Sequence, residues 1–250
     1  MMQCVQLMWD RLVRISESKG LLLNVKKTEC MVVAKQNEGL HFKLTSKGEV
    51  IKQVTKFKYL GATITNDCKD NTEIKQRIAI AKNNFHNLRP VLSNSKIKMD
   101  TKLQIIQTYV ISTLLYACES WTLDAECRKR LEAFEMWIYR RLLKIPWTAK
   151  VSNVKVLEKM GKEREMIDII RKRQMKLFGH VWRQKGVEHL VVSGYIEGKR
   201  ARGRQRLTFL TGLRQHTSTI TTNTAYTRTA EDRSSWRSSI GNVQTCTRHI

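Results

Sequence analysis

The chain has 250 residues, and its 46 lysines and arginines outnumber its 22 aspartates and glutamates, which gives a formal net charge of +24 and an isoelectric point near 10.1. The mean hydropathy is −0.41, no run of about twenty apolar residues could span a bilayer, and the N-terminus lacks the pattern of a secretory signal. These features argue against the membrane-spanning and secreted classes, and we expect a nuclear or cytoplasmic protein.

The excess of positive charge predicts a polyanionic partner, because the folded chain repels itself unless such a partner is bound. Nucleic acid is the first candidate, since the release of counterions drives its association with basic surfaces. An anionic membrane surface is the second candidate, and a basic but unspecialised surface is the third. We expect RNA, DNA or their hybrid, bound through the phosphate backbone, and no membrane partner.

The six cysteines are scattered along the chain, at positions 4, 30, 68, 118, 127 and 246, and none forms a C-x-x-C pair. A disulfide framework favours denser spacing in a smaller secreted chain, and a zinc site needs clustered ligands. We therefore expect reduced thiols and no metal site.

The first 65 residues combine one helix with short β-rich runs. Apolar residues at three- and four-residue steps predict a helix over residues 3–18 with one buried face, which Gly20 ends. The runs LLLNV (21–25), ECMVVA (29–34), LHFKLTSKGEVI (40–51) and FKYLGATIT (57–65) predict strands. Residues 1–65 are thus predicted to form a small antiparallel sheet with one helix.

Helical periodicity without any strand signal follows over residues 66–197. Asp70 or Asn71 is expected to cap a helix that ends at Pro90, and Asp100 and Asp124 are expected to cap the next two. Their buried faces are periodic, and the one in the first of these helices consists of Ile74, Ile78, Ala81, Phe85 and Leu88. A short helix over 152–160 and a long one over 162–185 complete an all-helical bundle.

The last part, residues 198–250, begins with the basic stretch GKRARGRQR (198–206) and continues with a Thr- and Ser-rich tail. The tail has little apolar area to offset its ordering entropy. We expect it to be partly disordered, with a short amphipathic turn at DRSSWRSSI (232–240). The predicted fold class is therefore α+β, mainly α.

Several stretches of the sequence occur together, in order, in one enzyme family. They are GLLLNVKKTECMVV (20–33), FKYLGATIT (57–65), YACESWTL (116–123), LEAFEMWIYRRLLKIPWTAK (131–150), RKRQMKLFGHVWR (171–183), and GKRARGRQR (198–206) followed by EDRSSWR (231–237). With them the chain resembles the C-terminal part of a non-LTR (LINE-type) retrotransposon endonuclease–reverse transcriptase, from the end of the palm through the thumb to a basic extension. The resemblance covers nearly the whole chain.

The resemblance implies an RNA-directed DNA polymerase that uses Mg²⁺, and it implies roles for four residues. Lys27 matches a lysine that protonates the leaving pyrophosphate. Tyr59, Leu60 and Gly61 match the primer grip, a hairpin whose backbone supports the end of the primer. The alternatives are a solvated lysine at a strand turn for Lys27, and a core tyrosine with a turn glycine for the hairpin.

Paired carboxylates, which two-metal nucleotide addition requires, are missing from the sequence. No two aspartates are adjacent, and none lies in a Tyr-x-Asp-Asp or Phe-x-Asp-Asp turn. Asp67 and Asp70 fit the capping of a turn and a helix better than a metal site. We expect a fragment that starts after the catalytic turn, is inactive alone, and holds no cofactor. The alternatives are a stand-alone nucleic-acid-binding or scaffold protein derived from such an element, and a decayed copy without function.

Basic residues on the helices and in the arm after them are the predicted contacts to nucleic acid. They are Arg140, Arg141, Lys144, Arg171, Lys172, Arg173, Lys199, Arg200, Arg202, Arg204 and Arg206. The basic arm could also be a nuclear-localisation tract or a solvated linker. Trp137, Trp147 and Trp182 are candidates for base stacking, although the pattern around Trp137 and Trp182 favours core packing.

Overall fold

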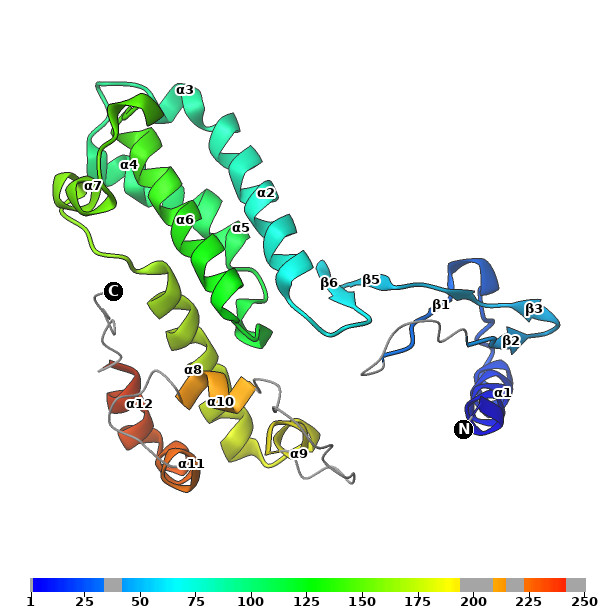
Figure 1. The fold of residues 1–250 in the computed structure, drawn as a ribbon. Helices are drawn as coiled ribbons and strands as arrows, with labels where there is room; N and C mark the ends of the chain where they lie inside the picture. Colours follow the sequence, from blue (N-terminus) through cyan, green and yellow to red (C-terminus); the bar gives the residue numbers. More distant parts are fainter. Residues whose placement is uncertain (1, 34–41, 194–208, 215–222, 242–250) are drawn as a thin grey trace. The chain divides into compact units, whose positions relative to one another are not determined.

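The computed structural model describes residues 2–33, 42–193, 209–214 and 223–241 (Figure 1). Helices dominate these residues and the strands are short, so the predicted α+β, mainly α class is confirmed. The chain divides into two compact units, residues 1–73 and residues 74–250. They are called here the N-terminal unit and the helical unit.

Helix α1 (Met2–Ser18) confirms the predicted first helix, and Gly20 follows it with φ +76°. The predicted burial of one face is wrong, because Val5, Met8 and Leu12 are exposed. A polar contact holds the helix instead: Gln6 donates from Nε2 to the carbonyl of Thr45 (2.8 Å) and accepts from its N–H (3.1 Å). The neighbouring strands are two residues long and offer too little apolar surface to cover a helix of this length.

The strands among the described residues form three separate two-stranded ladders. The pairs are β1 (Glu29–Cys30) with β4 (Lys52–Gln53), β2 (Thr45–Ser46) with β3 (Glu49–Val50), and β5 (Lys56–Tyr59) with β6 (Ala62–Thr65). The second and third ladders are antiparallel as predicted, but the first is parallel. LLLNV is also no strand, because Asn24 accepts a hydrogen bond from the N–H of Lys27 (3.1 Å) and starts the 3₁₀ turn η1 (Val25–Lys27).

The core of the helical unit lies between α2 (Asn71–Asn87), α6 (Ala125–Leu142) and the helical segments that link them. The links are α3 (Arg89–Leu92), α4 (Met99–Ile106), the π-helix η2 (Gln107–Ile111), α5 (Ser112–Leu114) and the 3₁₀ turn η3 (Cys118–Ser120). The predicted face of α2 is confirmed: Ile74, Ala81 and Phe85 are buried. The predicted continuous helix after Asp100 is instead broken by the π-helix.

The predicted cap at Asp124 and the predicted stop at Gly161 are both confirmed. Asp124 accepts from the N–H of Cys127 (2.7 Å) at the start of α6. After the 3₁₀ turn η4 (Trp147–Ala149), Ser152 caps α7 (Asn153–Met160), which Gly161 ends at φ +60°. Helix α8 (Met166–Gln184) begins four residues later than predicted, and α9 (Val187–Ser193) follows it.

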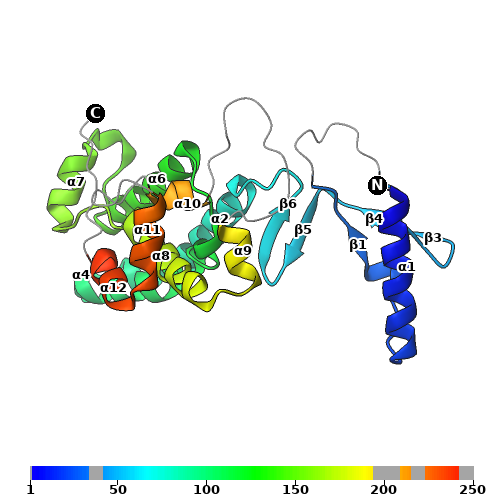
Figure 2. The same cartoon turned by 90° about the horizontal axis from the view of Figure 1, so that it is seen from below.

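Three helices of the C-terminal part pack on α8 (Figure 2). They are α10 (Phe209–Arg214), α11 (Asn223–Glu231) and α12 (Arg233–Gly241). Helix α12 confirms the predicted turn at DRSSWRSSI. The low burial expected for the rest of the tail is wrong for α10 and α11, because Leu213, Tyr226 and Ala230 join Phe178 and Trp236 in a second core. A few large aromatic side chains suffice here, since each buries about 150–250 Å².

Gly179 on α8 lies where the ring of Trp236 crosses the helix, and a Cβ at this position would come within 2.2 Å of Trp236 Nε1. The same Nε1 donates to the carbonyl of Met175 (2.9 Å). We expect Gly179→Ala to lower the free energy of unfolding by about 1–3 kcal/mol, because the buried ring must move and lose this hydrogen bond. Denaturant unfolding measures the change.

Gly212→Ala in α10 is the matched control, since a Cβ there meets no atom within 4 Å. Its effect should be neutral or slightly stabilising, because alanine favours the helix. Equal effects of the two substitutions would contradict the packing of α12 on α8.

Candidate nucleic-acid interface

The C-terminal end of α6 carries three predicted phosphate contacts, and the structure gives them different roles. Arg141 and Lys144 are exposed. Arg140 is half-buried, and its Nη2 donates to the carbonyl of Val151 (2.7 Å) and to Oδ1 of Asn153 (2.8 Å). Arg140 therefore holds the loop after α6 in place, and this part of the predicted site consists of Arg141 and Lys144.

The three successive basic residues 171–173 on α8 are less accessible to a nucleic acid than the sequence predicts. Arg171 is only 8% exposed and pairs with Asp168 (3.6 Å), so its predicted place on the surface is wrong. Arg173 donates to the carbonyl of Leu115 (3.1 Å), and Lys172 is half-buried. Three successive residues spread over about 200° around a helix, so at least one must face the neighbouring helices.

The predicted contacts Lys199, Arg200, Arg202, Arg204 and Arg206 lie outside the described residues. Their role stays a prediction.

The ring of Trp137 brings Arg141 and an unpredicted cation, Lys82, to one aromatic side chain. Lys82 on α2 and Arg141 on α6 both lie over the ring of Trp137, at 5.6 and 5.1 Å from its centroid. The ring itself packs against Phe85 (4.9 Å) and Phe134 (5.6 Å), which confirms the expected core packing. Lys82 was missed because only the packing of α2 against α6 brings it over the ring of Trp137.

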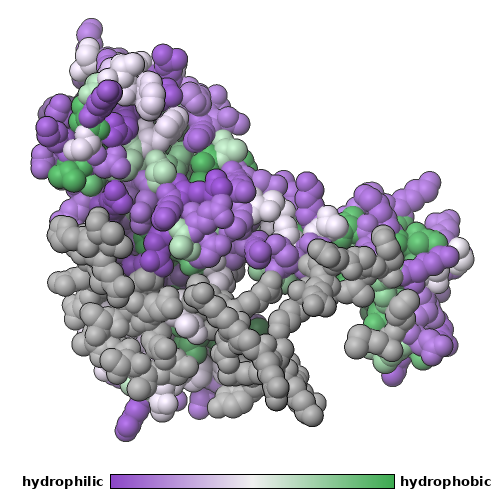
Figure 3. All heavy atoms as spheres, in the orientation of Figure 1, coloured by the Kyte–Doolittle hydropathy of each residue, from purple (hydrophilic) through white to green (hydrophobic). Residues whose placement is uncertain are grey.

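The other two candidate tryptophans differ sharply in exposure. Trp182 stacks on Phe178 (5.4 Å) and contacts His189 (4.2 Å), as core packing predicts. Trp147 lies in the turn η4 and is 92% exposed. In the coloured part of the helical unit in Figure 3, hydrophilic residues predominate.

In the N-terminal unit, the predicted primer-grip residues lie in the β5–β6 hairpin. Leu60 (φ +47°) and Gly61 (φ +84°) form its two-residue turn, with both residues in the left-handed region that type I′ turns require. Tyr59 is 57% exposed, so the alternative of a core tyrosine is wrong. The pairing of Phe57 with Ile64 and of Tyr59 with Ala62 places these four residues on one face of the hairpin.

Lys27 ends the turn η1, and its side chain is exposed. Its general-acid role stays a prediction. Asp67 accepts from the hydroxyl of Thr65 (2.6 Å) and the N–H of Lys69 (3.1 Å), and these bonds, that of Thr65 first, lower the pKa of its carboxyl. The predicted capping role of Asp67 is thereby confirmed. In the described parts of the chain, no three Asp, Glu, His or Cys residues are grouped so that they could hold a metal ion.

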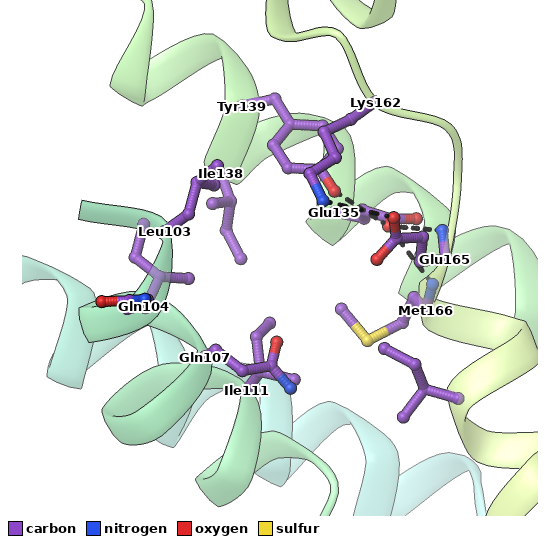
Figure 4. A pocket seen from close by; sticks show the side chains of 12 residues that line it. Leu103, Gln104, Gln107, Ile111, Glu135, Ile138, Tyr139, Lys162, Glu165 and Met166 are labelled. Carbon is purple, nitrogen blue, oxygen red and sulfur yellow. Dashed lines mark hydrogen bonds and ion pairs between the residues drawn. The ribbon is translucent and has the colours of Figure 1, made fainter. Parts of the chain in front are cut away.

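A cavity of about 240 Å³ opens between α4, η2, α6 and the start of α8 (Figure 4). Glu135, which is 4% exposed, contributes a carboxylate to its lining. Its Oε1 accepts from the N–H of Glu165 (2.9 Å), the N–H of Met166 (3.2 Å) and the hydroxyl of Tyr139 (3.3 Å). Burial raises the pKa of Glu135 above its ordinary value. The carboxylate anchors the positive end of the α8 dipole and disfavours a phosphate in this cavity.

Comparison with known proteins gave no relative: no family model, curated protein or solved structure matches the chain. Among the described helices, none combines the length and apolar character needed to cross a membrane.

Two replacements of Glu135 should distinguish the contribution of its hydrogen bonds to stability from the contribution of its charge. Glu135→Ala leaves two backbone N–H groups and a hydroxyl unpaired, and we expect it to cost about 2–4 kcal/mol. Glu135→Gln keeps an acceptor and should stay within about 1 kcal/mol of the native chain at neutral pH. Thermal and denaturant unfolding measure both.

The pH dependence of the same variants gives a second readout. The pKa of Glu135 in the folded chain lies above its ordinary value of 4.5. The stability that this raised pKa contributes to the folded state is therefore fully present below pH 4.5, and it is lost as pH rises through the folded pKa. Glu135→Gln should lack this loss. A glutamine variant as unstable as the alanine variant would contradict the assigned hydrogen bonds.

The turn of the β5–β6 hairpin should be improved by a residue that tolerates positive φ. Leu60→Asn is expected to stabilise the hairpin by about 0.5–1 kcal/mol, because leucine is strained in the left-handed region. Slower hydrogen exchange of the hairpin amides is the measurement. Leu60→Ala is the control, since it removes the side chain but keeps the strain; if it slows exchange as much, backbone strain is not the cause.

Proposed function

We propose that this chain binds RNA, DNA or their hybrid through phosphate contacts, as the end of the palm, the thumb and the basic extension of a non-LTR retrotransposon reverse transcriptase. The observation that carries the proposal is a group of exposed cations at the end of α6 and in the loop after it, for which the described part of the chain supplies no anionic partner. Such a partner places the chain in the nucleus or the cytoplasm.

The charged residues around this end of α6 are all positive. Residues 136–157 contain five lysines and arginines and no aspartate or glutamate. Arg141, Lys144 and Lys150 are exposed, and none of them forms an ion pair with another residue that the structure describes. Lys82 of α2 adds a fourth exposed cation, which shares the ring of Trp137 with Arg141.

Some other exposed cations of the helical unit form ion pairs within the unit. Arg130 pairs with Glu126, Lys162 with Glu165 (3.5 Å), and Arg164 with Glu132 (3.2 Å). Unpaired cations gain more from a phosphate than these do, because no existing ion pair has to be broken. Each contact releases counterions from the polynucleotide and carries no sequence information. The surface therefore suits binding that tolerates any sequence and weakens with salt.

The resemblance to the retrotransposon enzymes connects this surface to a reaction. In the parent enzyme, Mg²⁺ held by paired carboxylates would support nucleotide addition, and the thumb and primer grip would hold the template and primer. The proposal assigns the holding role to this chain. Lys27 and the hairpin residues Tyr59, Leu60 and Gly61 keep the roles that the resemblance implies.

A charge-neutralising variant tests the interface. The triple variant Arg141→Gln, Lys144→Gln, Lys150→Gln should weaken binding to duplex DNA and to an RNA–DNA hybrid of any sequence. The slope of log K against log salt should become shallower by roughly 2 to 3, because each lost phosphate contact changes it by about 0.9 on a duplex. Fluorescence anisotropy at several salt concentrations measures the slope.

The matched control removes three cations that are already paired: Arg130→Gln, Lys162→Gln and Arg164→Gln. It has the same net charge as the test variant, so overall electrostatics affects both equally. We expect it to keep most of the slope. Binding that does not depend on salt, or equal slopes for the two variants, would refute the proposed interface.

A further inference from the structure

We infer that Trp147 is a stacking platform for an unpaired base of single-stranded RNA or DNA. The inference rests on the proposed function and names a strand class that the phosphate contacts alone do not select. Aromatic side chains set in a basic surface bind single strands in this way, because every base has a π-face and the cations hold the adjoining phosphates.

The exposure of Trp147 is the first observation. Trp147 is 92% exposed, whereas Trp121 and Trp236 are each 2% exposed. An indole ring of this size would contribute several kcal/mol of stability if it were buried. A ring left in solvent forgoes this contribution, and a flat apolar surface is then free to take a planar partner.

The second observation is that the turn around the ring is held at both ends. Pro146 precedes the turn with φ −69°, and its carbonyl accepts from the N–H of Ala149 (3.2 Å). On the far side, the guanidinium of Arg140 binds the carbonyl of Val151 and the side chain of Asn153. These contacts tie the loop back to α6. The backbone that carries the ring is therefore positioned before any ligand arrives, which lowers the entropic cost of binding.

Backbone strain on either side of the ring is the third observation. Lys144 (φ +54°) and Lys150 (φ +47°) both adopt the left-handed conformation that side chains with a Cβ rarely take. Such residues cost of order 1–3 kcal/mol each. At Lys144 the same conformation ends α6, because the N–H groups of Lys144 and Ile145 donate to the carbonyls of Arg141 (3.2 Å) and Arg140 (3.0 Å). In this loop the two left-handed residues place a lysine before and after the tryptophan.

Charge complementarity decides between occupants of the ring. Arg141, Lys144 and Lys150 lie within six residues of Trp147, and no aspartate or glutamate occurs from 136 to 157. An apolar protein groove would have to remove water from these cations without neutralising them. A nucleotide strand brings a base for the ring and phosphates for the cations, so single-stranded nucleic acid is the occupant that we propose.

The experiment compares Trp147→Ala and Trp147→Phe with the native chain on two ligands of equal length. One is oligo(dT); the other is an abasic deoxyribose-phosphate oligomer, which keeps the phosphates but lacks the bases. Trp147→Ala should weaken oligo(dT) binding by about 5- to 100-fold, and Trp147→Phe should restore part of the loss, since a phenyl ring also stacks. Binding of the abasic oligomer and of duplex DNA should not change.

Each outcome separates the two proposals. An equal loss on oligo(dT) and on the abasic oligomer, or no loss on either, overturns the stacking role but leaves phosphate binding intact. If the native chain binds neither the abasic oligomer nor duplex DNA in a salt-dependent way, the proposed function itself fails. Unchanged thermal unfolding of Trp147→Ala, expected for so exposed a side chain, shows that the variant is folded.

Discussion

Glu135 on α6 accepts hydrogen bonds from the backbone N–H groups of Glu165 and Met166, and these bonds set the point at which α8 begins. Helix α8 then contributes to both cores of the helical unit. Met166, Ile167 and Ile170 complete the core around α6, and further along the helix Met175 and Phe178 form the base on which the C-terminal helices pack. The placement of α10, α11 and α12 thus depends on a buried carboxylate that meets a helix N-terminus.

Arginine side chains also hold segments of the helical unit together through hydrogen bonds to the backbone. Arg140, Arg173 and Arg183 each donate to a backbone carbonyl of another segment, at Val151, Leu115 and Ala230. The planar guanidinium has several fixed donors, so it can satisfy carbonyls at the ends of helices and turns. Part of the large positive charge therefore serves the fold, and the cations free for a polyanion are fewer than the net charge of +24 suggests.

The cations that remain free are not distributed evenly. Exposed cations such as Arg130, Lys162 and Arg164 pair with nearby carboxylates, whereas Arg141, Lys144 and Lys150 lie in a part of the chain without acidic residues. The same segment exposes Trp147 and includes two lysines in left-handed backbone. Exposed aromatic area, unpaired charge and backbone strain occur together there, and each is unfavourable for the isolated fold. Their coincidence is the strongest physical argument for a ligand at this position.

The sequence by itself determined the features that depend on near neighbours in the chain. The helical periodicity, the caps at Asp124 and Ser152, the stop at Gly161 and the β5–β6 hairpin all follow from residues within a few positions of one another. The tertiary structure decided which positively charged side chains are accessible to a ligand. Arg171 and Arg141 look alike in the sequence, but one pairs with Asp168 in a buried position and the other lies over Trp137. Packing also decided that α1 keeps an exposed apolar face and that a Thr-rich segment buries Tyr226, because burial depends on surfaces that residues distant in the chain supply.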